Sequence, residues 1–265
     1  MRENCEDRYQ PDTDEKRNIR NFVEYLECLA GLIGQTDKEA EARREERQSS
    51  DGRAALARIR RTLGKDPDRA MRAYPYVVRW TQNLDEQFPQ RAFNTTQHEQ
   101  YEWQVSCYYY IAALFAYYHK RRSWHHASEL KKSERNFGGS LRRLNDELSK
   151  NNKTEKEDNK VDRSKSLEKR STALLMSRRS DLPERLRRAV ALLKAAEIPI
   201  DWVQLLEDLK WWDEGTSHRS SSNPIPSVQR RWANTFWRVT PFDAGKKATD
   251  EASAATQPTQ TKEKN

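Results

Sequence analysis

The stretch LPERLRRAVALLKAAEIPIDWVQLLEDLKWWD, residues 182–213, contains two consecutive helix patterns that decide the fold class. In the first pattern, Leu182, Leu186 and Val190 recur every three or four residues and form one apolar stripe. Arg187 lies outside this stripe, so the helix is predicted to have one apolar side and one cationic side. Such a helix needs a core to pack against and leaves arginines facing solvent.

Both helices of this stretch also carry the sequence signals of a helix start. Asp181 precedes Pro183 and Glu184, which predicts an N-cap acid, a proline in the first turn and a capping box. Asp201 and Gln204 repeat the capping pattern for the second helix. The sequence therefore predicts helices beginning near residues 182 and 202.

Helical spacing of apolar residues recurs along most of the chain. It predicts helices over residues 15–34, 53–63, 97–122 and 140–150, and a last helix with Val228, Trp232, Phe236 and Val239 on one stripe. Residues 69–81 contain Pro75, which predicts a kinked helix or two short ones, with a strand as the weaker alternative. Tyr108, Tyr109 and Tyr110 could stack on bases, but their apolar helix favours core packing.

These patterns predict an all-α protein, a compact helical bundle in two halves with a disordered loop and a disordered C-terminal tail. The expected divisions are an N-terminal helix and charged linker (1–52), an N-terminal helical half (53–150), a disordered charged insertion (151–166), a C-terminal helical half (167–240) and a disordered tail (241–265). The insertion and the tail are charged or polar and offer no apolar surface to bury.

Charge, hydropathy and cysteine content indicate the class of partner and the cellular location of the protein. The 265 residues include 49 lysines and arginines against 41 acidic residues, a net charge of +8 that favours a polyanionic partner. No apolar run is long enough to span a membrane, and the N-terminus lacks the apolar core of a signal peptide. Cys5, Cys28 and Cys107 are an odd number without CxxC spacing, so reduced thiols and a cytoplasmic location are expected.

Nothing in the sequence favours an enzyme. No glycine loop for phosphates and no nucleophile elbow is found, and no cofactor is expected. Acid pairs such as Glu207 and Asp208 are adjacent, so on a helix they diverge by about 100° and do not easily share a metal. His119, His125 and His126 lie close together, but no cysteine or paired carboxylate stands at ligand spacing. We therefore expect no metal site and place these histidines in a basic, solvated loop.

Arginine and lysine pairs on separate predicted helices are the remaining functional signal. They are Arg60 with Arg61, Arg142 with Arg143, Lys169 with Arg170, Arg178 with Arg179, Arg187 with Arg188, and Arg230 with Arg231. The planar guanidinium suits phosphate oxygens, and each neutralised phosphate releases counterions, so converging pairs would bind nucleic acid without reading its sequence. The alternative is that they solvate helix faces and pair with nearby acids such as Glu184.

The motifs around these pairs resemble the CasB family, the small subunit of the type I-E CRISPR Cascade complex. The resembling segments are RAALARIRRTLG (53–64), GSLRRL (139–144), the dipeptide Lys169-Arg170, residues 182–213 and VQRRWANTFWR (228–238), in family order. The chain departs from the family pattern before residue 53, in the insertion and in the tail. Within the motif, Trp202, Trp211 and Trp212 are expected in the core or at subunit contacts rather than as stacking platforms.

The resemblance implies a non-enzymatic subunit without a cofactor, present in two copies beside other Cascade subunits and CRISPR RNA. It implies that the protein holds the displaced strand of target DNA and stabilises the R-loop. The residues carried over are Arg60, Arg61, Arg142, Arg143, Arg170, Arg187 and Arg188, with Arg53, Arg178, Arg179 and Arg231 as second choices. The alternative function is a helical protein-interaction scaffold whose basic surface is merely solvated.

Overall fold

A computed structural model describes residues 5–32, 50–87, 95–119, 134–152, 163–212 and 227–238. Within these ranges all regular structure is helical, which confirms the predicted all-α class. The elements are α1 (Cys5–Arg8), α2 (Glu15–Leu29), α5 (Ser50–Arg60), η1 (Pro67–Arg69), α6 (Tyr74–Gln87), α7 (Thr95–Tyr118), α8 (Phe137–Asn152), α9 (Arg163–Leu175), α10 (Leu182–Ala195), α11 (Trp202–Lys210) and α12 (Val228–Phe236). The predicted tail and the middle of the predicted insertion lie outside the described residues.

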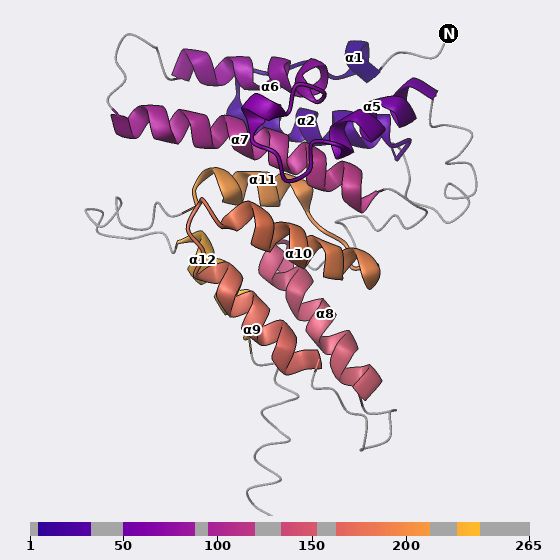
Figure 1. Cartoon of the computed structure of the whole chain (residues 1–265), viewed down its shortest axis with the longest axis vertical. Helices are drawn as coiled ribbons and strands as arrows, with labels where there is room; N and C mark the ends of the chain where they lie inside the picture. The colour runs from indigo at the N-terminus through magenta and orange to yellow at the C-terminus, as the bar shows by residue number, and fades with distance from the viewer. Residues whose placement is uncertain are drawn as a thin grey trace, which may run out of the picture.

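The helices form two groups that meet along α7 (Figure 1). On one side α7 packs against α5 and α6, and on the other it packs against α10 and α11. In the second group α8 contacts α9, α10 and α12, so α8 lies with the C-terminal helices in space. The bundle has two parts, as the sequence predicts, but α8 groups with the C-terminal helices and not with the predicted N-terminal half (53–150).

Local sequence signals explain several helix starts. The Asp14 carboxylate accepts a hydrogen bond from the Arg17 amide (2.9 Å) at the start of α2, and Asp201 accepts one from the Gln204 amide (3.0 Å) at the start of α11. The predicted capping box of α10 is wrong, because Asp181 makes no side-chain capping bond. Proline in the first turn still marks the start of α10.

Two helices differ from the sequence-based prediction. The kink expected at Pro75, and the strand alternative, are both wrong: Pro75 lies in the first turn of one continuous helix α6, where its missing N–H costs nothing. The sequence places Lys169 and Arg170 on a helix but does not predict the bounds of α9, because its sequence RSKSLEKRSTALL is mostly polar and buries only Leu167, Ser171 and Leu174. Residues 163–166 of the predicted insertion are therefore helical.

Aromatic rings fill the core between α2, α6 and α7. Phe22 packs against Trp80 and Tyr108, with ring centroids 5.7 and 5.1 Å apart. Tyr108 and Tyr109 are buried, which confirms that these tyrosines belong to the core. Trp202 and Trp212 are buried as expected, whereas Trp211 is exposed at the C-terminal end of α11.

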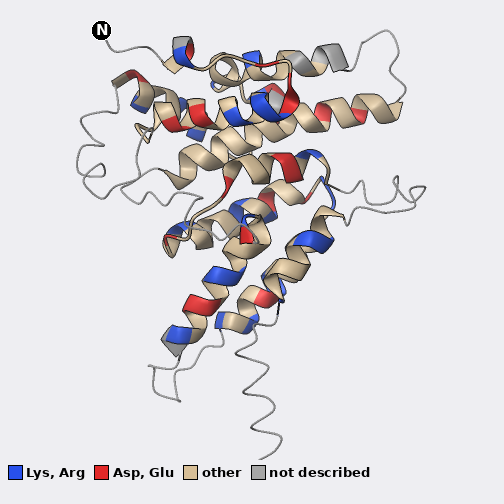
Figure 2. Cartoon of the chain, turned by 180° about the vertical axis from the view of Figure 1, so that it is seen from behind, with Lys and Arg blue, Asp and Glu red and all other residues tan. Residues whose placement is uncertain are grey.

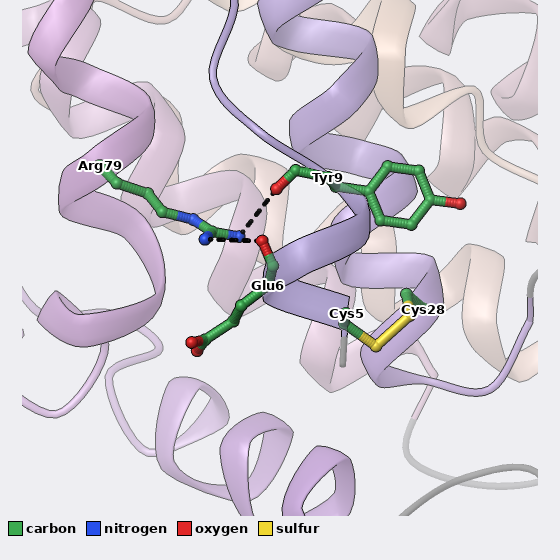
Figure 3. Close-up of a disulfide and its surroundings, with 5 residues drawn as sticks. All are labelled: Cys5, Glu6, Tyr9, Cys28 and Arg79. Atoms are coloured by element: carbon green, nitrogen blue, oxygen red, sulfur yellow. Dashed lines mark hydrogen bonds between the residues drawn. A yellow bond between two sulfur atoms is a disulfide. The ribbon is translucent and has the colours of Figure 1, made fainter. Parts of the chain in front are cut away.

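A disulfide joins the N-terminal helix to α2 (Figure 3). Cys5 and Cys28 are bonded, with Cα atoms 5.9 Å apart, so the expectation that these thiols are unpaired is wrong. Arg79 of α6 also holds this segment, because its guanidinium donates to the carbonyl oxygens of Glu6 (3.4 Å) and Tyr9 (3.2 Å). The pairing depends on the packing of α1 against α2, which the cysteine spacing alone does not reveal.

Glu27, next to this disulfide, makes stability depend on pH. Burial, with smaller contributions from Glu24 and Asp201, raises its pKa from 4.5 to about 7. The folded state then holds a proton that the unfolded state has released, so stability falls as pH rises from about 4.5 to 7. We expect Glu27→Gln to match the wild type at pH 4 and to be more stable at pH 8 by roughly 1–3 kcal/mol.

Urea unfolding at a series of pH values measures this difference. The same substitution at exposed Glu99 controls for the change in net charge. A wild-type advantage at pH 8 would contradict the assignment of Glu27 as a buried, protonated carboxyl.

Candidate nucleic-acid interface

A pocket of about 400 Å³ opens between α8, α9 and α10. Its apolar lining comes from all three helices and consists of Leu141, Leu167, Ala173, Leu174, Ala189, Ala191 and Leu192. The polar lining consists of Arg170, Ser171, Arg185 and Arg188. We call this site the arginine pocket.

Helix spacing explains why these arginines meet. Arg185 and Arg188 are three residues apart on α10 and therefore share one face, while Leu186 and Val190 point into the core. Arg170 reaches the same pocket from α9, which packs against α10. Arg170 and Arg188 are exposed, so cationic side chains from two helices line the pocket where it meets solvent.

Glu184 fixes the orientation of the arginines on the first turns of α10. Its carboxylate accepts two hydrogen bonds from Arg187 (2.8 Å each) and one from Arg188 (2.9 Å). The hydrogen bonds from Arg187, and then those from Arg188, lower the pKa of Glu184 to about 2. One carboxylate thus faces two guanidiniums, and the cluster keeps a net positive charge.

Several predicted binding residues have partners inside the protein. Arg142 is only 12% exposed, donates to the backbone carbonyl of Arg238 and lies 3.9 Å from the Asp146 carboxylate. Arg179 donates twice to the Trp212 carbonyl oxygen, at 3.0 and 2.8 Å. These contacts tie α8 to the end of α12 and the turn before α10 to the end of α11.

Other predicted residues lie apart from the arginine pocket. Arg53, Arg60 and Arg61 belong to α5 or the turn after it, and α5 packs against α2 and α7. Arg143 is half-buried on α8 and Arg178 is exposed before α10, but neither lines the pocket. Basic residues therefore occur on both groups of helices (Figure 2), and of the predicted residues Arg170 and Arg188 share the pocket.

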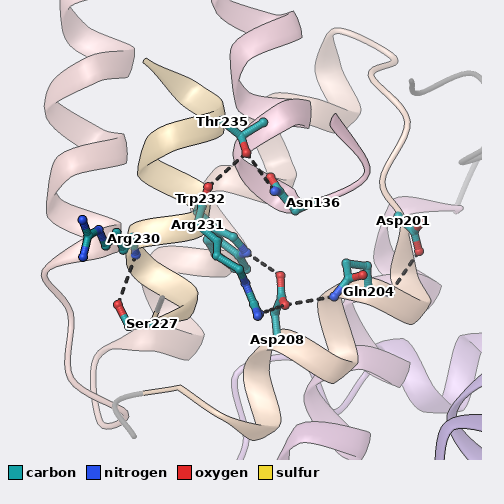
Figure 4. Close-up of polar contacts among 9 residues, drawn as sticks. All are labelled: Asn136, Asp201, Gln204, Asp208, Ser227, Arg230, Arg231, Trp232 and Thr235. Atoms are coloured by element: carbon teal, nitrogen blue, oxygen red, sulfur yellow. Dashed lines mark hydrogen bonds and ion pairs between the residues drawn. The ribbon is translucent and has the colours of Figure 1, made fainter. Parts of the chain in front are cut away.

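Arg231, a second-choice residue, belongs to a buried polar network between α11 and α12 (Figure 4). The Asp208 carboxylate is 1% exposed and accepts hydrogen bonds from Trp232 Nε1 (2.5 Å), Arg231 Nη2 (2.6 Å) and Gln204 Nε2 (3.0 Å). Burial raises the pKa of Asp208, and the hydrogen bond from Trp232 opposes that rise. Within the segment 228–238, Arg231 and Trp232 therefore join α12 to α11 and are explained by packing rather than by binding.

The structure also revises the environment of the predicted histidine loop. His119 is buried against Phe115, with ring centroids 4.3 Å apart, so its expected place in a solvated loop is wrong. His125 and His126 lie outside the described residues. Among the residues that are described, no group of histidine, cysteine and acidic side chains is arranged to hold a metal ion.

Sequence reasoning missed two members of the arginine pocket. The three-residue spacing between Arg185 and Arg188 is a visible signal, but the packing of α9 against α10 is not predicted. The sequence does not indicate a role for Ser171, because a single serine in a polar stretch is expected at the protein surface.

In the described part of the chain, no helix is long and apolar enough to cross a membrane.

Comparison with known proteins identifies the family. The model of the CRISPR-associated protein Cse2 family matches residues 55–237, from α5 to the end of α12. The chain is 31% identical over 199 residues to the CRISPR-associated protein Cse2 of Thermus thermophilus, covering 75% of this chain and 88% of that protein. Its fold resembles the crystal structure of M. ruber CasB, with a TM-score of 0.51, 25% identity and coverage of 90% and 99% of the two chains.

These matches define an all-helical CRISPR-associated protein. The chain belongs to the Cse2 family, also named CasB, of the type I-E Cascade complex, which confirms the resemblance found in the sequence.

Proposed function

We propose that this protein holds a nucleic-acid backbone without reading its sequence, and that it thereby stabilises the R-loop through the displaced DNA strand. The observation that carries the proposal is the convergence of Arg170, Arg185 and Arg188 on one pocket, in a Cse2 family chain with a net charge of +8. No catalytic step belongs to this role. The protein acts by binding alone.

The physical reason lies in the energy balance of strand exchange. The heteroduplex formed in an R-loop is about as stable as the DNA duplex that it replaces. A few kcal/mol of contacts to the displaced strand, as an order of magnitude, are therefore enough to shift the equilibrium toward the open state. Arginines supply such contacts through charge and through paired hydrogen bonds to phosphate oxygens.

The proposal includes the assembly in which the protein works. Its partners are the other Cascade subunits, CRISPR RNA, target DNA and a second copy of itself, in the cytoplasm. Exposed Trp211, Trp237 and Met176 are apolar surface suited to protein contacts in such an assembly. Arg53 and Arg60 on α5, and Arg61 in the turn after it, remain proposed contacts to nucleic acid in that larger assembly.

A salt titration tests backbone binding. We expect the affinity of the full chain for single-stranded DNA to fall steeply with salt, with a slope of log affinity against log salt of about −2 or steeper, because at least three phosphates are neutralised. Oligonucleotides of equal length and different sequence are expected to bind alike, and fluorescence anisotropy measures both effects. A flat salt dependence would instead support the interaction scaffold with a merely solvated basic surface.

A further inference from the structure

We propose that the arginine pocket takes up one unstacked base of the bound single strand, while the arginines at its mouth hold the adjoining phosphates. This inference rests on the proposed function and adds a site to it. It assigns one nucleotide of the strand a fixed position between α8, α9 and α10. The bases on either side stay outside the protein.

The size and lining of the pocket suit a largely apolar ring. Its volume of about 400 Å³ lies within the range of roughly 300–1,000 Å³ that is typical of small-molecule sites. Leucine side chains from all three helices, Leu141, Leu167 and Leu192 among them, supply apolar walls. A phosphate alone would leave these walls in contact with water, whereas a base covers them.

The inner polar group of the pocket is Ser171. Ser171 is only 2% exposed and lines the pocket. Its hydroxyl has no hydrogen-bond partner within the described residues. Leaving a buried hydroxyl without a partner is unfavourable, so a ligand that bonds to it gains affinity. Because a hydroxyl both donates and accepts, it can pair with the polar edge of any base. One such group orients a base without selecting its identity, as non-specific binding requires.

The charges at the mouth identify the ligand as part of a polyanion. Arg170 lies on α9, and Arg185 and Arg188 lie on α10, so arginine side chains from two helices line the pocket. A base that enters the pocket leaves a phosphate on each side of its sugar at this opening. Guanidinium planes can also stack on the base itself, which adds to the contact.

Binding of oligothymidylate, compared with an abasic oligonucleotide of the same length, tests the proposal. The two ligands carry the same phosphates, so a preference for oligothymidylate isolates the contribution of the bases. We expect the full-length wild-type protein to prefer oligothymidylate by at least about fivefold at fixed salt. Ser171→Ala is expected to reduce this preference, and Ala189→Leu, which fills the pocket, to abolish it.

The outcomes separate the pocket from the backbone grip. If the wild type binds both strands equally with a steep salt dependence, the pocket takes no base and the proposed function stands. If the wild type binds neither strand, both the base-binding proposal and the proposed function are wrong. Circular dichroism checks folding, and Ala191→Leu is a second filling variant should Ala189→Leu not fold. A preference that survives in the folded filling variant also overturns the proposal, because another site then holds the base.

Discussion

Replacing Arg170, Arg185 and Arg188 together by glutamate is expected to weaken binding of single-stranded DNA by about 100-fold or more at low salt. At roughly 1 kcal/mol for each lost phosphate contact, three contacts correspond to such a factor. The slope of log affinity against log salt is expected to become less steep by about two, because fewer counterions are released. Anisotropy titrations over a range of salt concentrations measure both changes.

A matched control variant distinguishes binding at the arginine pocket from a general effect of net charge. Lys65, Arg69 and Arg72 are exposed and lie around η1, away from the pocket, and their replacement by glutamate changes the net charge by the same amount. This control is expected to retain most of the affinity. Equal losses in both variants would mean that binding follows net charge alone and that the arginine pocket has no special part.

The same pocket variant tests the role of the protein in the complete complex. When it is assembled with guide RNA and the larger subunits, we expect a smaller fraction of target DNA in the open R-loop state. Attack by a single-strand-specific nuclease on the displaced strand reports that fraction. Full R-loop formation by the assembled variant would show that other subunits hold the strand.

Asp208→Ala is expected to lower the free energy of unfolding by about 3 kcal/mol. Trp232 Nε1 and Gln204 Nε2 lose an acceptor, and the Trp232 donor is then left buried without one. Arg231 also loses its carboxylate, although this loss costs less because the arginine side chain is 40% exposed. Since the network joins α11 to α12, the variant is expected to loosen α12 as well as reduce overall stability.

Urea denaturation and hydrogen exchange measure the two consequences separately. Asp146→Ala removes an exposed carboxylate from α8 and is expected to change stability by less than about 1 kcal/mol. Faster hydrogen exchange of α12 amides in the Asp208→Ala variant would show that the loss of stability includes a loosening of α12. A stability close to that of the wild type would show that solvent replaces the lost hydrogen bonds without cost.

The sequence predicts the helices well wherever apolar residues repeat at helical spacing. Helix α10 begins at Leu182, as its leucine stripe and Pro183 indicate, even though the Asp181 cap is absent. The bounds of helix α9 are not predicted, because only Leu167, Ser171 and Leu174 are buried along its length. Its stability comes from packing against α8 and α10, which no local pattern expresses.

The candidate site was only partly predictable for a related reason. Composition and motif identify arginines but not the direction in which each side chain points. Arg142 and Arg179 donate to backbone carbonyls, which have no signature in a sequence. The arginine pocket requires three helices at once, so Ser171 and Arg185 acquire a role only after the chain has folded.

The cysteine arrangement gives the protein a practical property for labelling. All three cysteines are described, and since Cys5 and Cys28 are paired, Cys107 is the one remaining thiol. Cys107 is fully buried and burial raises its pKa, so the folded chain presents no reactive thiolate to maleimides. A cysteine introduced at exposed Lys169, next to Arg170, is then the single site that takes up a dye. A fluorophore placed there reports the arrival of a DNA strand without any change to the native cysteines.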